Sequence, residues 1–357
     1  MGRSPWRTLR VGRKEARRST RLLAIPSTLV LTLALAACGG AAASPSEDPA
    51  STDGEGAEGE TYSMSIAVVD PDVPSVPLLE AAELLRADGH DVTLEEVAEP
   101  ELAIEGLVRG TFDFSGESIS PALIAMQQDA PIVVIGDVVA NEWALFAEEE
   151  IQSCEDLDGM RIGLFSEGSV ATAMIRAWVE QECAGIEPEY LVIGGSDVRA
   201  LALVAGEINA TALTIADIAV LEQEGTEVNL LVDFGESLAD LRPSALYANS
   251  EYVAENPEAT QAFLAAILEV HDQINADPAY LEEIITKHLP EVDEAILESV
   301  AAEYVERGLF DAAALTEDNL EFTIQFFVDA GVIEPGLEVA DVADLSHVQA
   351  AREELGG

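Results

Sequence analysis

From Tyr62 to about residue 234, short apolar runs alternate with amphipathic stretches, and this pattern restricts the possible folds more than any other feature. The apolar runs predict strands at 64–69, 90–97, 112–116 and 131–139, and a second series at 161–165, 190–195, 208–214 and 229–234. The stretches between them predict helices at 78–89, 101–110, 120–128, 170–182, 196–207 and 216–225. Beyond Glu251 the pattern is almost entirely helical. Such alternation predicts an α/β fold whose mostly parallel sheets carry helices on both faces.

A weak internal repeat indicates two similar units. Residues 107–115 match residues 203–211, and each segment reads as a helix end, a glycine and a strand. Any helix–glycine–strand unit resembles another, so the match alone is not specific. Because it occurs at the same point of both series, it favours two similar α/β lobes.

The N-terminal residues have the pattern of an export signal. Eight of the 17 Lys and Arg residues lie in the first 21 positions, and an apolar stretch runs from Leu22 to Ala37. That stretch is short for a membrane span, which needs about 20 residues. The sequence Leu35-Ala36-Ala37-Cys38 resembles a bacterial lipobox, so we predict a signal peptide at 1–37 and lipidation of Cys38. An ordinary signal peptide with a chance cysteine is the alternative, and the export route, Sec or twin-arginine, stays open.

The segment after Cys38 predicts a tether. Residues 39–60 contain no bulky apolar side chain and several acidic ones, so they cannot form a core. We therefore expect residues 38–60 to link a lipid anchor to a globular part on the extracytoplasmic face of a bacterial cell membrane.

The charge of the chain excludes one class of partner. The formal net charge is −51, and the only lysine beyond the predicted signal is Lys287. Nucleic acid binding needs clustered Lys and Arg, so it is excluded. An acidic, lysine-poor composition with 48% hydrophobic residues favours adaptation to high salt, where self-repulsion is screened. A merely acidic surface is the alternative.

Several segments occur in an order and spacing that resemble a known family: 77–79, 103–114, 120–123, 154–170, 200–212, 256–258, 315–331 and 344–346. Together they resemble the type II solute-binding proteins of ABC importers. The resemblance is to the branch that serves nitrate, sulfonates, taurine and thiamine-precursor pyrimidines.

The resemblance implies a two-lobed type II periplasmic-binding-protein fold with two crossover strands and a helical C-terminal region. It implies one lobe of residues 61–142 plus 245–357 and a second of residues 143–244, with crossovers near 143–147 and 244–248. It also implies a small-molecule ligand, ABC permease subunits as partners, no cofactor and a monomer.

Ligand-binding residues are predicted from the sheets themselves, because open parallel sheets bind ligands outside the carboxyl ends of their strands. The loops and turns at those ends contain these candidates: Ser75, Glu117, Ser118, Ser166, Gly168, Ser169, Thr214 and Asp217. Ser169 also fits as the N-cap of the following helix, which would place free backbone N–H groups toward the cleft. The alternative is that Ser169 only caps its helix and that Ser75, Ser118 and Thr214 only stabilise turns.

The charges near these loops favour a neutral or cationic ligand, such as a pyrimidine or an amine. The loops contain Asp70, Asp72, Glu117, Glu167 and Asp217 but no Lys or Arg, and Arg199 is expected at a sheet edge. An anion such as nitrate, a sulfonate or taurine, which would recruit Arg or Lys, is the alternative. Trp143 and Tyr247 are candidates for stacking on a planar ligand or for packing at the hinge.

Two further cysteines form a candidate disulfide. Cys154 precedes a predicted strand and Cys183 ends the helix that follows it, so the antiparallel return of the helix brings the two thiols together. Outside the cytoplasm such a pair is expected to oxidise, and two buried free thiols are the alternative.

An enzyme is the less favoured class. His90, His271, His288 and His347 form no spaced cluster, and the sequence lacks Cys/His metal patterns, GxSxG and a P-loop. Pyrimidine-synthesising enzymes of this fold have a cysteine-rich motif that is absent here. We therefore predict no catalytic or metal-binding residues. The alternatives are such an enzyme and a lipoprotein that docks a partner protein.

Overall fold

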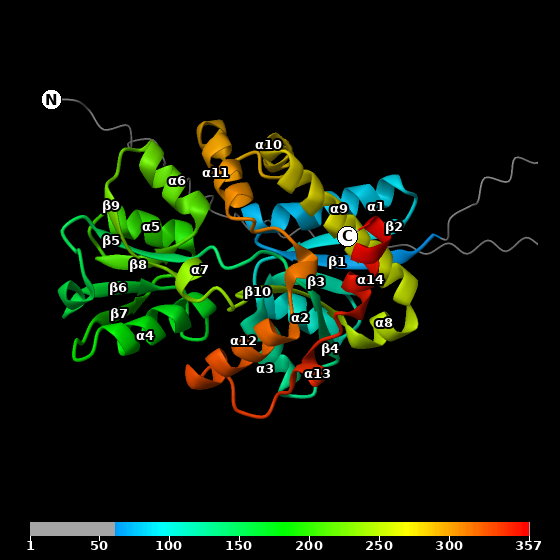
Figure 1. Cartoon of the computed structure of the whole chain (residues 1–357), viewed down its shortest axis with the longest axis horizontal. Helices are drawn as coiled ribbons and strands as arrows, with labels where there is room; N and C mark the ends of the chain where they lie inside the picture. The colour runs from blue at the N-terminus through cyan, green and yellow to red at the C-terminus, as the bar shows by residue number, and fades with distance from the viewer. Residues whose placement is uncertain (1–60, 357) are drawn as a thin grey trace, which may run out of the picture. The chain divides into compact units, whose positions relative to one another are not determined.

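The computed structural model of the protein describes residues 61–356, which contain two five-stranded sheets (Figure 1). The predicted signal peptide at 1–37, the lipidation site Cys38 and the tether at 38–60 lie outside the described residues. Among residues 61–356, none of the helices is both long and apolar enough to span a membrane.

The first sheet has the strand order β2-β1-β3-β10-β4. Its strands are β1 (Ser63–Val69), β2 (Asp91–Val97), β3 (Phe114–Ser118), β4 (Ile132–Gly136) and β10 (Ser244–Asn249). β1 pairs in parallel with β2 and β3, whereas β10 runs antiparallel to both β3 and β4. The sheet is therefore mostly parallel, with one antiparallel strand that arrives from far along the chain.

Helices cover both faces of the first sheet, which explains why β1 is continuously apolar from Ile66 to Val69, after the serines at 63 and 65. Ile66 and Val68 belong to a core shared with α1 (Val76–Ala87) and α9 (Pro257–Ala276). Ala67 and Val69 face the opposite way, into a core with α2 (Pro100–Val108) and α3 (Ile119–Met126). Successive strand residues point to opposite faces, so a strand buried on both faces has no polar alternation.

The C-terminal part is helical, as predicted. Its helices are α8 (Ser250–Glu255), α9, α10 (Pro278–His288), α11 (Glu294–Glu306), α12 (Glu317–Asp329), α13 (Val339–Val342) and α14 (Ser346–Leu355). Buried side chains of α9, α10, α11 and α14 share the core that contains α1. α12 instead packs into the core on the side of α2 and α3.

The second sheet has the order β7-β6-β8-β5-β9. Its strands are β5 (Ala144–Glu148), β6 (Arg161–Leu164), β7 (Glu189–Val192), β8 (Ala210–Leu213) and β9 (Val228–Asp233). In Figure 1, α5 (Ser196–Val204) and α6 (Ile215–Gln223) lie over one face and α4 (Val170–Glu182) over the other. β6 is parallel to β7 and β8, and β5 is antiparallel to β8 and β9.

The chain passes between the sheets twice. It leaves β4 at Gly136 and enters the second sheet at β5, and after β9 and the short α7 (Phe234–Ser237) it returns at β10. The expected crossovers at 143–147 and 244–248 therefore fall on β5 and β10, the antiparallel strand of each sheet. The predicted α/β fold with two mostly parallel sheets, helices on both faces and a helical C-terminal region is confirmed.

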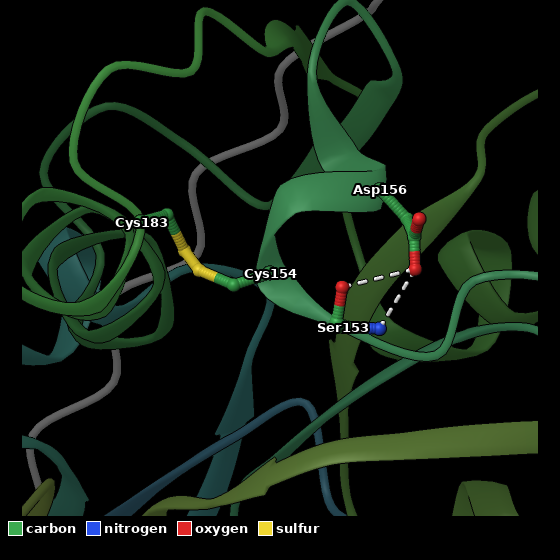
Figure 2. Close-up of a disulfide and its surroundings, with 4 residues drawn as sticks. All are labelled: Ser153, Cys154, Asp156 and Cys183. Atoms are coloured by element: carbon green, nitrogen blue, oxygen red, sulfur yellow. Dashed lines mark hydrogen bonds between the residues drawn. A yellow bond between two sulfur atoms is a disulfide. The ribbon is translucent and has the colours of Figure 1, made fainter.

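A disulfide joins Cys154 and Cys183, whose Cα atoms are 5.4 Å apart (Figure 2). Cys154 begins the 3-10 helix η2 (Cys154–Leu157), and Cys183 is the C-cap residue that follows α4. Beside it, the carboxylate of Asp156 accepts hydrogen bonds from the backbone N–H of Ser153 at 3.0 Å and from its hydroxyl at 3.1 Å. The bridge thus fastens the C-terminal end of α4 to the turn that precedes β6.

Candidate functional site

A cleft of about 1060 Å³ lies at the carboxyl ends of strands from both sheets. From the first sheet it receives the residues that end or follow β1 and β3, including Asp72 and Ser118. From the second sheet it receives residues that follow β6 and β7, including Ser166 and Ser196. Ligands of open α/β sheets bind at such ends, so the cleft is the candidate binding site.

The structure places the predicted site residues in three locations. Those that line the cleft are Glu117, Ser118, Ser166, Gly168 and Ser169. Ser75 and Thr214 line a smaller pocket of about 80 Å³, which shares Glu117 and Trp143 with the cleft. Asp217 lines neither cavity, and its carboxylate accepts hydrogen bonds from the backbone N–H and the hydroxyl of Thr214.

Three of the predicted hydroxyl groups are engaged in local caps. Ser75 donates to the carbonyl of Asp72 at 2.8 Å, and Thr214 donates to Asp217 at 2.8 Å. Ser169 accepts from the backbone N–H of Thr172 at 3.3 Å, as an N-cap of α4 does. A ligand that reaches this end of α4 therefore meets the unpaired backbone N–H groups of the first helical turn more readily than the Ser169 hydroxyl.

A hydrogen bond connects the two sides of the cleft. Ser120 in α3 donates to the carbonyl of Gly168 at 3.4 Å, and its hydroxyl lies 3.3 Å from that of Ser118. The loop before α4 is therefore in contact with the helix that follows β3. The neighbouring Glu167 forms an ion pair with Arg176 at 2.7 Å and does not line the cleft.

Acidic side chains form one wall of the cleft. Glu117 at the end of β3 and Asp72 after β1 both line it, together with Asp70. The pKa of Glu117 is raised, first by loss of hydration and then by repulsion from Asp72. Loss of hydration also raises the pKa of Asp72, with added repulsion from Asp217 and Asp70. No cation within the described part of the chain forms an ion pair with either carboxylate.

A buried carboxyl group lies in the smaller pocket beside the cleft. Glu142 is only 4% exposed and accepts hydrogen bonds from the Tyr304 hydroxyl at 2.5 Å and the Ile215 backbone N–H at 3.4 Å. Burial raises the pKa of Glu142 to about 8, against the lowering effect of the bond from Tyr304. Glu142 thereby contacts both α11 and the first residue of α6.

Arg199 corrects the prediction that no basic residue reaches the site. It lines the cleft, is only 1% exposed, and is the only Lys or Arg in the cleft lining. It does follow an edge strand, β7, as expected, but the carboxyl end of an edge strand opens to the same side as those of its neighbours. Applying the strand-end rule to 190–195 as well would have identified Ser196 and Arg199.

The two aromatic candidates occupy different environments. Trp143 lines both the cleft and the smaller pocket, and the guanidinium carbon of Arg199 is 5.9 Å from its ring centroid. Tyr247 in β10 is fully buried and lines neither cavity. Only Trp143 is therefore placed to stack on a ligand, while Tyr247 packs in the core.

One group of side chains has the spacing of metal ligands, and it lies away from the cleft. Glu80, Glu83 and His288 cluster where α1 meets α10. The ammonium group of Lys287 pairs with Glu83 and, at 2.7 Å, with Glu80, which also lies 2.7 Å from His288. The carboxylates already have a cationic partner, so the cluster is an ion-pair network.

Comparisons with known proteins agree with this architecture. A binding protein of Brucella abortus (strain 2308) is 25% identical over 264 residues, which cover 72% of this chain and 82% of the relative. The ligand binding component of an ABC-type import system from Staphylococcus aureus has 16% identity and a TM-score of 0.67, covering 82% of this chain and 99% of its own. The periplasmic nitrate-binding protein NrtA from Synechocystis PCC 6803 has 14% identity and a TM-score of 0.66, covering 83% and 89%.

A family model covers the central part of the sequence. The model described as NMT1/THI5 like matches residues 83–280, from within α1 to the first turn of α10. This match includes the second sheet and most of the cleft lining. Because it spans more than half of the sequence, the chain belongs to the NMT1/THI5-like family.

Proposed function

We propose that this protein is the extracytoplasmic solute-binding component of an ABC importer and that it captures a small organic molecule in the cleft. The observation that carries the proposal is the convergence of strand ends from both sheets on one cavity. The resemblance to proteins described as ligand- and nitrate-binding components supports it. Ligand binding would favour a closed state that the permease recognises, so the cycle needs no covalent chemistry.

The proposed lobes follow the sheets. One lobe consists of residues 61–142 and 245–357, and the other of residues 143–244. The segments around 137–143 and 238–243 connect the two sheets and would act as the hinge. A hinge of this kind lets the Phe165 side of the cleft approach the Ile124 side without breaking either core.

The anchor completes the proposal. Cleavage after residue 37 and lipidation of Cys38 would hold a monomer on the outer face of the cell membrane, with residues 38–60 as a tether. Mass spectrometry of the N-terminal peptide from native protein tests this. A diacylglyceryl-modified Cys38 is expected, and an unmodified peptide that contains Cys38 would refute it.

A receptor is favoured over an enzyme by the composition of the cleft. The four histidines His90, His271, His288 and His347 all lie outside its lining, which combines carboxylates, hydroxyls, one guanidinium and apolar side chains. Such a lining can hold a solute through hydrogen bonds and charge.

Ligand binding is tested on the purified chain in high salt, by native mass spectrometry and by thermal shift against a panel of small organic molecules. The matched variants are Phe165→Asp, in the cleft lining, and Leu201→Asp, on the exposed face of α5. Both exchange an exposed apolar side chain for a carboxylate. We expect the first to lose the ligand-induced shift and the second to keep it; equal responses would place binding elsewhere.

Transport is tested separately by deleting the gene and measuring uptake of the bound compound. Loss of uptake, restored by the wild-type gene but not by the Phe165→Asp gene, is expected. Unchanged uptake would contradict the role in import.

A further inference from the structure

The guanidinium group of Arg199 is held in place at the cleft by neutral groups. Its Nε donates to the hydroxyl of Thr211 at 2.9 Å, one terminal nitrogen donates to the carbonyl of Ala212 at 3.0 Å, and the other donates to the carbonyl of Gly194. A guanidinium has five N–H donors, so these bonds leave two of them free. The side chain is therefore fixed while part of its donor capacity remains unused.

The positive charge of Arg199 has no anionic partner. None of the ion pairs between residues 61 and 356 includes it, although the fields of Asp217 and Asp197 act on it. A buried charge without a counter-charge is costly, and it is retained where something else supplies the charge. Because Arg199 lines the cleft, a bound oxyanion is in a position to do so.

The wall formed by Glu117 and Asp72 is acidic and has no positively charged partner among the described residues. Both carboxyl groups line the cleft, and none of the ion pairs between residues 61 and 356 includes either of them. The neighbouring Asp70 adds to the negative field. No cation of the described residues faces this wall, and an ammonium group placed against it would favour the ionised form of Glu117.

Apolar side chains from both sides line the same cleft. Ile104 and Val108 come from α2, Ile124 from α3, and Phe165 follows β6. Val108, Ile124 and Phe165 are exposed by 43%, 36% and 44%, so each retains apolar surface that a ligand could cover. Burying them against an apolar part of a ligand would contribute about 25 cal/mol for each Å².

We propose that the ligand is a small zwitterion with an apolar body, whose oxyanion pairs with Arg199 and whose ammonium group faces Glu117. This inference rests on the proposed function, since it concerns the solute held in the same cleft. It replaces the expectation of a purely neutral or cationic ligand, because that expectation assumed that no basic residue reaches the site. Arg199 and Glu117 then act as the specificity-determining pair.

The test compares three matched sets of compounds of increasing chain length: ω-amino carboxylates, alkylamines and alkylcarboxylates. Binding to the full chain is measured by calorimetry in high salt. We expect the best ω-amino carboxylate to bind at least about tenfold more tightly than the amine or the carboxylate of the same length. Equal or tighter binding of a singly charged compound, or no binding of any ω-amino carboxylate, would overturn the inference.

Two variants separate the roles of the charged residues. Glu117→Gln should remove the advantage of the ω-amino carboxylate over the alkylcarboxylate, whereas Arg199→Gln should remove its advantage over the alkylamine. Glu167→Gln, on the same side as the α4 loop but outside the cleft lining, is the control and should change neither. Should Arg199→Gln fail to fold, Glu117→Gln still decides, because an unaltered preference would refute the pairing.

Failure of the zwitterion inference can be distinguished from failure of the proposed function. If another solute binds and Phe165→Asp abolishes its binding, the cleft is a solute-binding site and only the inference of a zwitterionic ligand is wrong. If no solute binds and uptake is unaffected by gene deletion, the proposed function itself fails.

Discussion

The phenol of Tyr304 donates a 2.5 Å hydrogen bond to the carboxylate of Glu142, although the two residues are 162 positions apart in the chain. Glu142 precedes β5, the first strand of the second sheet, and Tyr304 lies in α11 of the C-terminal region. Glu142 also accepts from the N–H of Ile215, the first residue of α6. One buried carboxyl group therefore links a connection between the sheets to helices that pack with each of them.

The stability of the protein should fall with rising pH because of Glu142. Its pKa is about 8 in the folded protein against an ordinary value of 4.5, so between these values the folded state holds more protons than the unfolded one. The free energy of unfolding then decreases as pH rises through this window. Glu142→Gln should have a higher free energy of unfolding than wild type, by at most about 5 kcal/mol near pH 8 and by only about 1 kcal/mol near pH 5.

Urea unfolding at both pH values measures this difference. Glu222→Gln, at an exposed position of α6, is the matched control and should leave the pH dependence unchanged. A Glu142→Gln curve parallel to that of wild type would show that Glu142 is not the titrating group. Tyr304→Phe should lower the free energy of unfolding by about 1–3 kcal/mol, because it leaves the buried carboxyl group of Glu142 without its hydrogen-bond donor.

The ion pair between Asp137 and Arg242 joins the two segments that connect the sheets. Arg242 Nε lies 3.3 Å from the Asp137 carboxylate, and both side chains are largely buried. Burial raises the pKa of Asp137 to about 7 even though Arg242 lowers it. Near pH 8 the pair is charged on both sides, and near pH 5 Asp137 is mostly protonated.

Arg242→Met should therefore destabilise the protein in a pH-dependent way. Near pH 8 we expect the free energy of unfolding to fall by about 3–5 kcal/mol, because the Asp137 carboxylate is left buried without its partner. Near pH 5 the cost should be smaller, because the protonated acid carries no charge. The double variant Asp137→Asn/Arg242→Met should show no such pH dependence; a cost that is the same at both pH values would argue against the ion pair.

How far the sequence alone predicts this molecule depends on the range of the interactions. The apolar run of β1 predicted a strand with both faces covered, because a strand that is buried on both faces consists of consecutive apolar residues. The Ser169 cap was likewise predictable from a polar residue before a helical pattern. In contrast, the meeting of Glu142 with Tyr304 depends on how the C-terminal helices return to the connection between the sheets, which no local pattern contains.

The site was predicted in part for the same reason. The strand-end rule selected Ser118 and Ser166, which both line the same cleft, because the rule needs only the strand positions. It could not show that the hydroxyls of Ser75 and Thr214 are used in caps beside that cleft. Arg199 was missed because its edge position was taken to separate it from the site, whereas the strand ends share one side of the sheet.

Reduction of the Cys154–Cys183 disulfide should destabilise the protein. The bridge closes a loop across 29 positions, and its loss is expected to cost about 3–4 kcal/mol by the loop-entropy estimate. Urea unfolding with and without reductant measures the effect. The double variant Cys154→Ser/Cys183→Ser should be equally weakened and insensitive to reductant; recovery of both cysteines as free thiols in a non-reducing peptide map would refute the bridge.

Salt should stabilise the folded chain through screening of its net charge of −51. At molar ionic strength the Debye length is about 3 Å, against about 10 Å at 0.1 M, so repulsion between surface carboxylates nearly vanishes. We expect the unfolding temperature to rise steadily from low salt to molar NaCl and KCl alike. Sucrose at equal osmolality is the control, because it is excluded from the protein surface but does not screen charge. An unfolding temperature that is flat in salt, or that rises equally in sucrose, would show that the acidic surface carries no adaptation to high salt.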